Sequence, residues 1–320
     1  MMKIKLVSLL LLVSFSNVII GQNNDLDNFK KFLPYIIKGL QQPKPEKQLD
    51  ENTSGVFQKP WEVKKLQDSE IQNIIKKIID NKRFKVKKDY TGEWKLDFFS
   101  KLKNFESIEE IYKSNGALSN TFVQVSEIKI LDEANSSAYF INKNKSIKSN
   151  ESKKLNFNSG QIHTTFPIIK EYSNLNGSIK VTLKEYSKIR YKVFQKNDTD
   201  IEFNLGDIKN IKLLRIDKNK AYFILPKVVD NIEITSTNVK NETHSSQSIS
   251  KIPKKVYDFA TKDNLTDESI NSFIKNLSKQ DVYENYQMLI YETNGIIDSL
   301  YIYLKSNPIV LASKTIEIKL

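Results

Sequence analysis

The sequence of 320 residues predicts a mainly β protein of the α+β class. Apolar residues recur with the helical period near the N-terminus and in one later segment, whereas they alternate with polar residues over most of the C-terminal half. Asn-Gly pairs beside apolar runs add hairpin signals. We therefore expect a helical N-terminal region, then an α+β module and two antiparallel β-sandwich-like modules.

The first residues have the pattern of an export signal. Lys3 and Lys5 precede a largely apolar run over residues 6–20, and the small residue Gly21 follows. The run is shorter than the roughly 20 residues that a membrane-spanning helix needs, and it suits the core of a signal peptide. We expect residues 1–21 to be a signal peptide cleaved after Gly21, with an uncleaved N-terminal anchor as the alternative. The mature chain then has no transmembrane span and is periplasmic, outer-membrane-associated or extracellular.

Residues 22–59 are expected to form an N-terminal amphipathic helix and a linker. Apolar side chains recur at helical spacing over residues 25–40, with lysines on the opposite side. Docking of this helix on the body of the protein is the preferred interpretation, and binding to a membrane or a partner is the alternative. Pro43, Pro45 and mixed charge predict that residues 41–60 are the linker.

An α+β module is expected over residues 60–145. Isoleucines at helical spacing, with Asp68 or Ser69 as the N-cap, predict its first helix. In chain order we expect a helix, two strands, a helix and a strand at residues 68–81, 84–86, 94–99, 108–114 and 122–130. The polar and basic stretch 142–154 has almost nothing to bury, so it predicts the end of this module.

Two β modules are expected beyond that boundary, over residues 155–226 and 227–320. In the first, apolar and polar residues alternate along short segments separated by polar turns, as in an antiparallel sandwich or barrel. In the second, a helical insertion is expected near residues 266–279. The pair Asn294 and Gly295 lies between two apolar runs and predicts a C-terminal hairpin.

The net charge of +12, from 50 Lys and Arg against 38 Asp and Glu, indicates a solvated surface. The only arginines are Arg83, Arg190 and Arg215, whereas nucleic-acid binders use arginine for paired contacts to phosphate and guanine. The many lysines are interleaved with acidic residues. We therefore expect no specific nucleic acid partner, and we expect any attraction to anionic glycans or phospholipid head groups to weaken with salt.

The residue inventory excludes several chemistries. The chain has no cysteine, which excludes disulfides, thiolate metal sites and a cysteine nucleophile. Its nine glycines are too scattered for a dinucleotide fingerprint or a phosphate-binding loop. His163 lies in an expected strand and suits a structural role. The polar stretch 240–250 is expected to be a serine-rich loop, in which His244 would be solvated. No motif therefore identifies a catalytic, cofactor-binding or metal site.

Two sets of side chains remain as candidate sites. Three acidic residues around one predicted turn offer oxygen ligands of the kind that calcium prefers: Asp198, Asp200 and Glu202. The turn lacks the spacing and the glycine of an EF-hand, so an ordinary hairpin turn is the preferred interpretation. Four tyrosines on the expected C-terminal hairpin form a candidate ligand platform for sugar rings or peptide, with core packing as the alternative: Tyr286, Tyr291, Tyr301 and Tyr303.

The export signal over residues 1–24, the lysine-, asparagine- and isoleucine-rich composition and the lack of cysteine resemble exported proteins of unknown function from flavobacteria and their relatives. The resemblance implies a periplasmic, outer-membrane-associated or extracellular location and no particular activity. Residues 313–320 contain no glycine and differ from the sorting domain of the gliding-associated secretion system. An AT-rich eukaryotic source is the alternative, and there Asn135, Asn176 and Asn241 would be glycosylation acceptors.

Together these observations predict an exported, non-catalytic protein of the cell envelope or extracellular space that binds a protein partner or a glycan through surfaces of its β modules. Two alternatives stay open. A carboxylate-based polysaccharide hydrolase needs no fixed sequence spacing, and a cleft with two carboxyl groups about 5–10 Å apart would favour it. A structural subunit of a surface or secretion assembly would pair through exposed strand edges, and a long unpaired edge strand would favour it.

Overall fold

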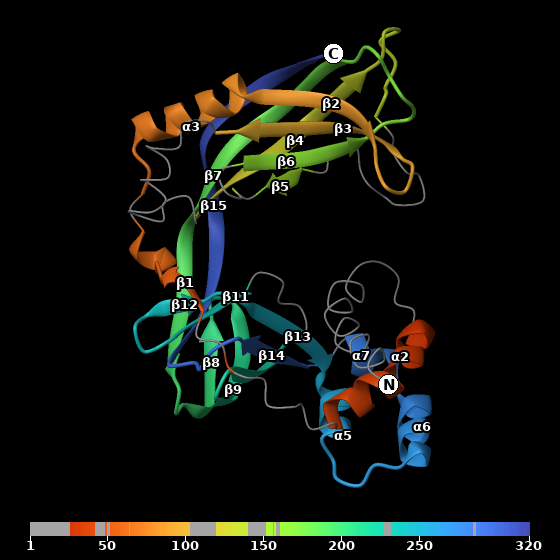
Figure 1. Ribbon diagram of the computed structural model, residues 1–320, viewed down its shortest axis with the longest axis vertical. Coiled ribbons are helices and arrows are strands. Elements are labelled where there is room, and N and C mark those ends of the chain that lie inside the picture. Colours follow the sequence, from red (N-terminus) through yellow and green to blue (C-terminus); the bar gives the residue numbers. More distant parts are fainter. Residues whose placement is uncertain are drawn as a thin grey trace. The chain divides into compact units, whose positions relative to one another are not determined.

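The computed structural model describes most of the chain after the predicted signal peptide (Figure 1). The described residues are 26–41, 49, 52–63, 65–102, 120–139, 152–155, 157, 161–226, 232–283 and 286–320. The predicted signal peptide, the predicted helix 108–114 and most of the stretch 142–154 lie outside them. Among the described residues, no helix is long and apolar enough to cross a membrane.

The fold belongs to the mainly β α+β class that the sequence predicts, with all strand pairs antiparallel in three sheets. One sheet has the order β13-β14-β10-β9-β8, with bounds Gln247–Pro253, Gln287–Thr293, Lys220–Leu225, Ile208–Asp217 and Thr199–Leu205. A three-stranded sheet has the order β2-β3-β6, with bounds Lys82–Lys88, Trp94–Lys101 and Gln161–Pro167. The largest sheet has the order β1-β12-β11-β15-β7-β4-β5, with bounds Thr53–Val56, Glu242–His244, Ile232–Thr237, Ser299–Lys319, Asn176–Gln195, Thr121–Leu131 and Lys153–Leu155.

The chain divides into two compact units, and each unit is discontinuous in sequence. Unit 1 comprises Met1–Phe57 with Arg190–Leu304, and unit 2 comprises Gln58–Ile189 with Lys305–Leu320. Strands β7 and β15 each contribute residues to both units. The modules predicted from the sequence are consecutive instead, and their ranges stay a prediction.

Unit 1 contains an antiparallel β core and a separate helical cluster. Alternate side chains of seven strands are buried together, with Phe194, Phe223 and Leu300 fully or almost fully enclosed. The helices α2 (Leu26–Gln41), α5 (Lys254–Ala260), α6 (Asp267–Asn276) and α7 (Lys279–Tyr283) gather beside β13 (Figure 1) and share their own core. The predicted N-terminal helix therefore docks on other helices of its unit through Leu33 and Ile37.

Unit 2 buries one helix together with β strands. Helix α3 (Asp68–Asp80) begins with a capping box, in which the Glu70 carboxylate accepts the Gln67 backbone N–H at 2.6 Å. Its isoleucine stripe then faces the core, as the spacing of these residues predicts. Side chains from α3, β3, β4, β6, β7 and β15 meet in this core, so the three-stranded sheet has one buried side. A short 3₁₀ helix, η1 (Pro60–Glu62), precedes α3.

Two predictions about the last module are wrong. The expected hairpin at Asn294 and Gly295 does not form, because β14 pairs with β10 and β13 whereas β15 pairs with β11. The Asn-Gly signal is local, and it does not reveal that the flanking strands belong to different sheets. The polar stretch 240–250 contains β12 and the start of β13 rather than a loop. The helical insertion is confirmed as α6.

Candidate functional site

The three-stranded sheet of unit 2 presents a cationic outer surface. Leu96, Phe98, Ile162 and Phe166 point into the core and fix the sheet from below. Because side chains alternate along a strand, the intervening residues point to the other side. We call this side the basic face, and its residues are Arg83, Lys85 and Lys87 of β2, Lys95, Asp97, Phe99 and Lys101 of β3, and Gln161, His163 and Thr165 of β6.

Asp97 lies in the middle of the basic face and binds two neighbours. One carboxylate oxygen lies 2.6 Å from His163 Nε2, and the other lies 2.8 Å from Lys87 Nζ. Partial burial alone would raise the pKa of Asp97, but hydrogen bonds and charges from Lys87 and His163 outweigh it and lower the pKa. The side chain of Asp97 is therefore an ionised anchor that holds Lys87 of β2 and His163 of β6 in place.

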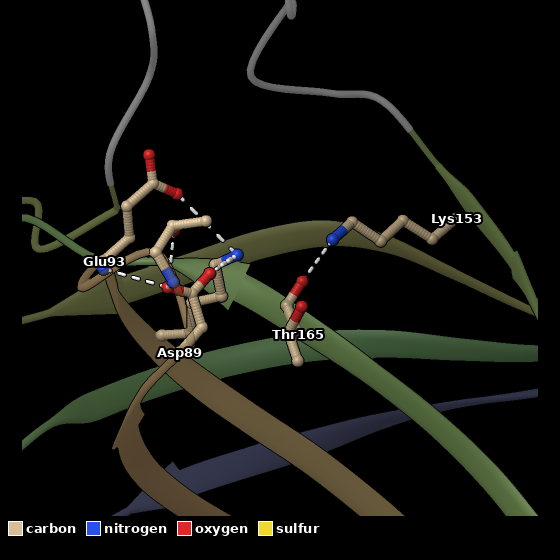
Figure 2. A network of polar contacts seen from close by, with 6 residues as sticks. Asp89, Glu93, Lys153 and Thr165 are labelled. Atoms are coloured by element: carbon tan, nitrogen blue, oxygen red, sulfur yellow. Dashed lines mark hydrogen bonds and ion pairs between the residues drawn. The ribbon is translucent and has the colours of Figure 1, made fainter. Parts of the chain in front are cut away.

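The β2–β3 turn holds a second ion pair (Figure 2). The Asp89 carboxylate accepts the Thr91 and Glu93 backbone N–H groups at 2.9 and 3.0 Å and the Thr91 hydroxyl at 2.6 Å. It also contacts Lys95 Nζ, and this hydrogen bond is the main reason why the pKa of Asp89 is far below its ordinary value. Glu93 lies 3.7 Å from the same ammonium group. The turn is thereby fixed to the basic face.

Lys153 of β5 reaches the edge of the basic face on the side of β6. Its Nζ donates to the Thr165 carbonyl oxygen (Figure 2) and lies 4.9 Å from the centre of the Phe166 ring. Burial, and secondarily the positive charge of Lys95, lowers the pKa of Lys153. Lys153 therefore adds a further lysine beside Lys95 at this edge of the basic face.

Three cations of the basic face have no acidic partner within ion-pair distance among the residues that the structure describes. They are Arg83 and Lys85 of β2 and Lys101 of β3, all exposed. Arg83 is in register with Phe99, and Phe99 with His163, whose ring centre lies 6.5 Å from that of Phe99. The face therefore combines unneutralised cations with a half-buried aromatic ring on a sheet fixed by its core, which suits binding of an anionic ligand.

A buried carboxyl group of unit 2 lies apart from the basic face. Glu185 of β7 is in register with Thr121 of β4 and is 5% exposed. Burial raises the pKa of Glu185, and the charge of Lys65 acts in the opposite direction. In the described part of unit 2, the charged group that acts on Glu185 is thus a lysine, whereas a carboxylate hydrolase needs a second carboxyl group.

The four tyrosines of the predicted ligand platform do not share an exposed face. Tyr291 is fully buried in β14, Tyr301 and Tyr303 are 6% exposed in β15, and only Tyr286 is exposed, at 39%. The Tyr301 ring lies 4.7 Å from that of Phe57. Buried rings cannot offer a flat surface to a sugar. The alternative, core packing, therefore applies to Tyr291, Tyr301 and Tyr303.

The predicted turn with three acidic residues joins β7 to β8. The Asp198 carboxylate accepts the Gln195 backbone N–H at 2.9 Å, and Asp200 forms an ion pair with Lys212 at 2.7 Å. Glu202 lies 4.0 Å from the same ammonium group. In the described parts of the chain, no group of three or more acidic or histidine side chains is placed to hold a metal ion. The segment is therefore a turn with ion pairs, and the predicted hairpin does not form because β7 and β8 belong to different sheets.

His244 is buried, in contrast to the prediction. It is 7% exposed in β12, and its Nε2 donates to the Ile296 carbonyl oxygen at 3.1 Å. Its Nδ1 therefore accepts from Ser236 Oγ at 2.9 Å, and Ser236 Oγ lies 2.9 Å from the Tyr291 hydroxyl. That hydroxyl donates to Gln247 Oε1 at 3.1 Å. We call Ser236, His244 and Tyr291 the buried network, and the exposed side chain of Gln247 ends it at the surface.

The buried network contains a Ser–His contact that the sequence does not reveal. Ser236 is completely enclosed, and its hydroxyl has both neighbours inside the core of unit 1. A nucleophilic serine must reach a substrate, so this arrangement satisfies buried polar groups rather than activating a nucleophile. In β11, Ser236 follows Ile232 and Ile234 at every second position, and this alternation is the sequence signal that could have placed Ser236 inside. The three polar residues of β12 give no such signal for His244.

Comparison of the chain with protein-family models, with curated proteins and with solved structures gives no match. The functional argument therefore depends on the geometry of the described residues, and above all on the basic face.

Proposed function

We propose that the protein is an exported, non-catalytic protein of the cell envelope or extracellular space that binds a protein partner or a glycan. In this proposal the two units act as β-sandwich-like modules, and the basic face is the binding surface. The pattern of residues 1–21 supports export. The antiparallel sheets with buried alternate residues support the assignment of β-sandwich-like modules.

The observation that carries the proposal is the set of cations without acidic partners on the basic face. Lys87 and Lys95 have carboxylate partners, whereas Arg83, Lys85 and Lys101 have none among the described residues. Exposed cations attract anionic groups of a ligand, and this attraction weakens as salt screens it. The sheet beneath them is fixed by buried Leu96 and Phe98, so the cations are held in a constant order.

The acids of the basic face do not support the hydrolase alternative. Hydrolysis of a glycoside by two carboxyl groups needs a proton donor whose pKa is raised. Here the pKa values of Asp89 and Asp97 are lowered, and both groups are bound to lysines. The assembly-subunit alternative has one specific observation in its favour, because β2 is an edge strand of its sheet.

A pull-down with the tagged mature chain, beside a glycan array, tests the proposal. The wild type, an Arg83→Glu/Lys85→Glu variant and a Lys192→Glu/Lys209→Glu control are applied to the envelope fraction of the cells that make the protein. The control changes two exposed lysines of unit 1 and matches the change in charge. We expect the wild type and the control to retain the same partner or glycan and the first variant to lose it. Equal retention by all three proteins would remove the basic face from the proposal.

A further inference from the structure

The edge strand β2 combines charge, apolar side chains and an unpaired backbone edge. Each residue from Lys82 to Lys88 is in register with β3 on one side, and no described strand pairs with β2 on its other side. In an edge strand, alternate backbone N–H and C=O groups point away from the sheet and are open to another strand. This edge can therefore bind a segment of extended chain.

The side chains of β2 define what that segment contains. Arg83, Lys85 and Lys87 follow one another on the basic face at every second position, which spaces them about 6.6–6.8 Å apart. Phe84 and Val86 point to the opposite side, where they pack against the core of unit 2 but are only half-buried. An added strand would place its own side chains about 4.5–5.5 Å from those of β2, position by position.

We propose that β2 binds an extended acidic segment of a partner protein by strand addition, with Asp or Glu alternating with apolar residues. This inference rests on the proposed function and names the partner of the same surface. The acidic residues would face Arg83, Lys85 and Lys87, and the apolar residues would cover Phe84 and Val86. Charged and apolar side chains alternate at every second position both in β2 and in the segment. The acidic residues can therefore face the cations while the apolar residues contact Phe84 and Val86.

The cations and the apolar side chains of β2 argue against other molecules that could bind this edge. A second copy of β2 would place lysine and arginine opposite lysine and arginine, which is unfavourable in a sheet. An acidic glycan or a nucleic acid would satisfy the cations but would offer no backbone amides to the strand edge and no apolar groups to Phe84 and Val86. The lysines that prevent self-pairing therefore favour an acidic partner strand.

The test measures binding of a labelled synthetic peptide, in which glutamate alternates with valine between threonine ends, to the mature chain. We expect binding at low salt, and we expect a peptide of equal composition with its glutamates grouped together to bind at least about tenfold more weakly. Two further peptides carry N-methyl groups on one or the other alternate set of backbone amides. Only one of these two should lose binding, because strand addition uses alternate N–H groups.

Substitutions test the same register. Lys85→Glu should weaken binding of the alternating peptide by at least about tenfold. The same variant should prefer a peptide with lysine in place of glutamate. Lys209→Glu on unit 1 is the control, and it should change neither the affinity nor the preference. Circular dichroism of each variant checks that the fold is kept. Equal binding of the parent, grouped and N-methylated peptides would overturn strand addition, as would tighter binding of a sulfated glycan or an oligonucleotide that displaces the peptide.

The outcomes separate this inference from the proposed function. If no peptide binds but the pull-down still depends on Arg83 and Lys85, strand addition is wrong and the basic face stays the binding surface. If neither the peptides nor the pull-down depends on these residues, both fail. Concentration-dependent self-association lost in Lys85→Glu would instead identify a second copy as the occupant and would also overturn the inference.

Discussion

The two histidines of the chain lie in networks of opposite character. His163 is exposed on the basic face of unit 2 and binds an ionised carboxylate, Asp97, which also binds Lys87. His244 is enclosed in unit 1 and binds a serine hydroxyl and a backbone carbonyl, so its partners carry no formal charge. The comparison shows how burial decides the chemistry of a polar cluster. Charged side chains are stable where water reaches them, whereas the interior favours neutral groups that are hydrogen-bonded to one another.

The largest expected effect comes from removing the ring at the centre of the buried network. Tyr291→Ala should lower the free energy of unfolding by about 3–5 kcal/mol, because it leaves a cavity and unpaired polar groups. Tyr286→Ala is the matched control, since Tyr286 is exposed, and it should change stability by at most about 0.5 kcal/mol. Urea unfolding followed by circular dichroism measures both. Similar midpoints for the two variants would contradict the contrast.

Removal of a single hydroxyl tests the network without a large cavity. Ser236→Ala should cost about 1–3 kcal/mol, because it leaves His244 Nδ1 without its donor inside the core. Ser54→Ala removes an exposed hydroxyl that lies 2.9 Å from the Thr243 hydroxyl, and it should cost much less. The same urea experiment compares them. Equal losses of unfolding free energy would mean that burial does not determine how much these hydrogen bonds contribute to stability.

The pH dependence of stability should report the burial of His244. Burial lowers the pKa of His244 below its ordinary value of 6.5, and the hydrogen bond to the Ile296 carbonyl only partly compensates. The unfolded chain therefore binds the proton more readily, so the stabilising contribution is complete above pH 6.5 and is lost as the pH falls toward the folded pKa. The slope is at most about 1.4 kcal/mol per pH unit.

Thermal unfolding between pH 5 and 7 measures this slope in the wild type and in His244→Gln. The difference in melting temperature between the two proteins should shrink as the pH falls, because only the wild type loses the contribution of neutral His244. Ser54→Ala serves as the control, because its exposed hydroxyl does not titrate in this range and its pH dependence should follow that of the wild type. A His244→Gln protein with an unchanged pH slope would show that His244 does not titrate in this range.

The smallest effect is expected for an ion pair of the basic face. Lys87→Ala removes the partner that lies 2.8 Å from Asp97, yet the Lys87 side chain is 39% exposed, so the loss should be at most about 1 kcal/mol. High salt should reduce it further, since salt screens exposed charges. Urea unfolding at low and high salt, with Lys209→Ala as the control, checks this expectation. A loss as large as that of Ser236→Ala would remove the contrast between the two networks.

Period predicts the local elements well. The isoleucine stripe of α3, the N-terminal helix, the insertion α6 and the alternating strands β8 to β10 are confirmed. These elements are visible because burial of one side imposes a period on nearby residues. The N-cap of α3 is Gln67 rather than Asp68 or Ser69, and β7 is one strand of 20 residues where short strands are predicted. The Asn294-Gly295 pair misleads because nothing local distinguishes a hairpin from a connection between sheets.

The sites depend on pairs that are distant in sequence. Asp97 meets His163, and Ser236 meets Tyr291, only through strand pairing or core packing. Alternation in β2 is visible in the sequence, but that segment alone does not show that it forms a sheet edge. The basic face therefore follows from strand order, which a single sequence specifies weakly.

Strands β7 and β15 each run through both units, and this connectivity constrains the synthesis and inheritance of the protein. Residues 305–320 belong to unit 2, so that unit cannot be completed on the ribosome before they are synthesised, whereas domains of consecutive residues fold in order of synthesis. No single cut releases either unit intact. Recombination that exchanges one unit must therefore replace two separate stretches of the chain together.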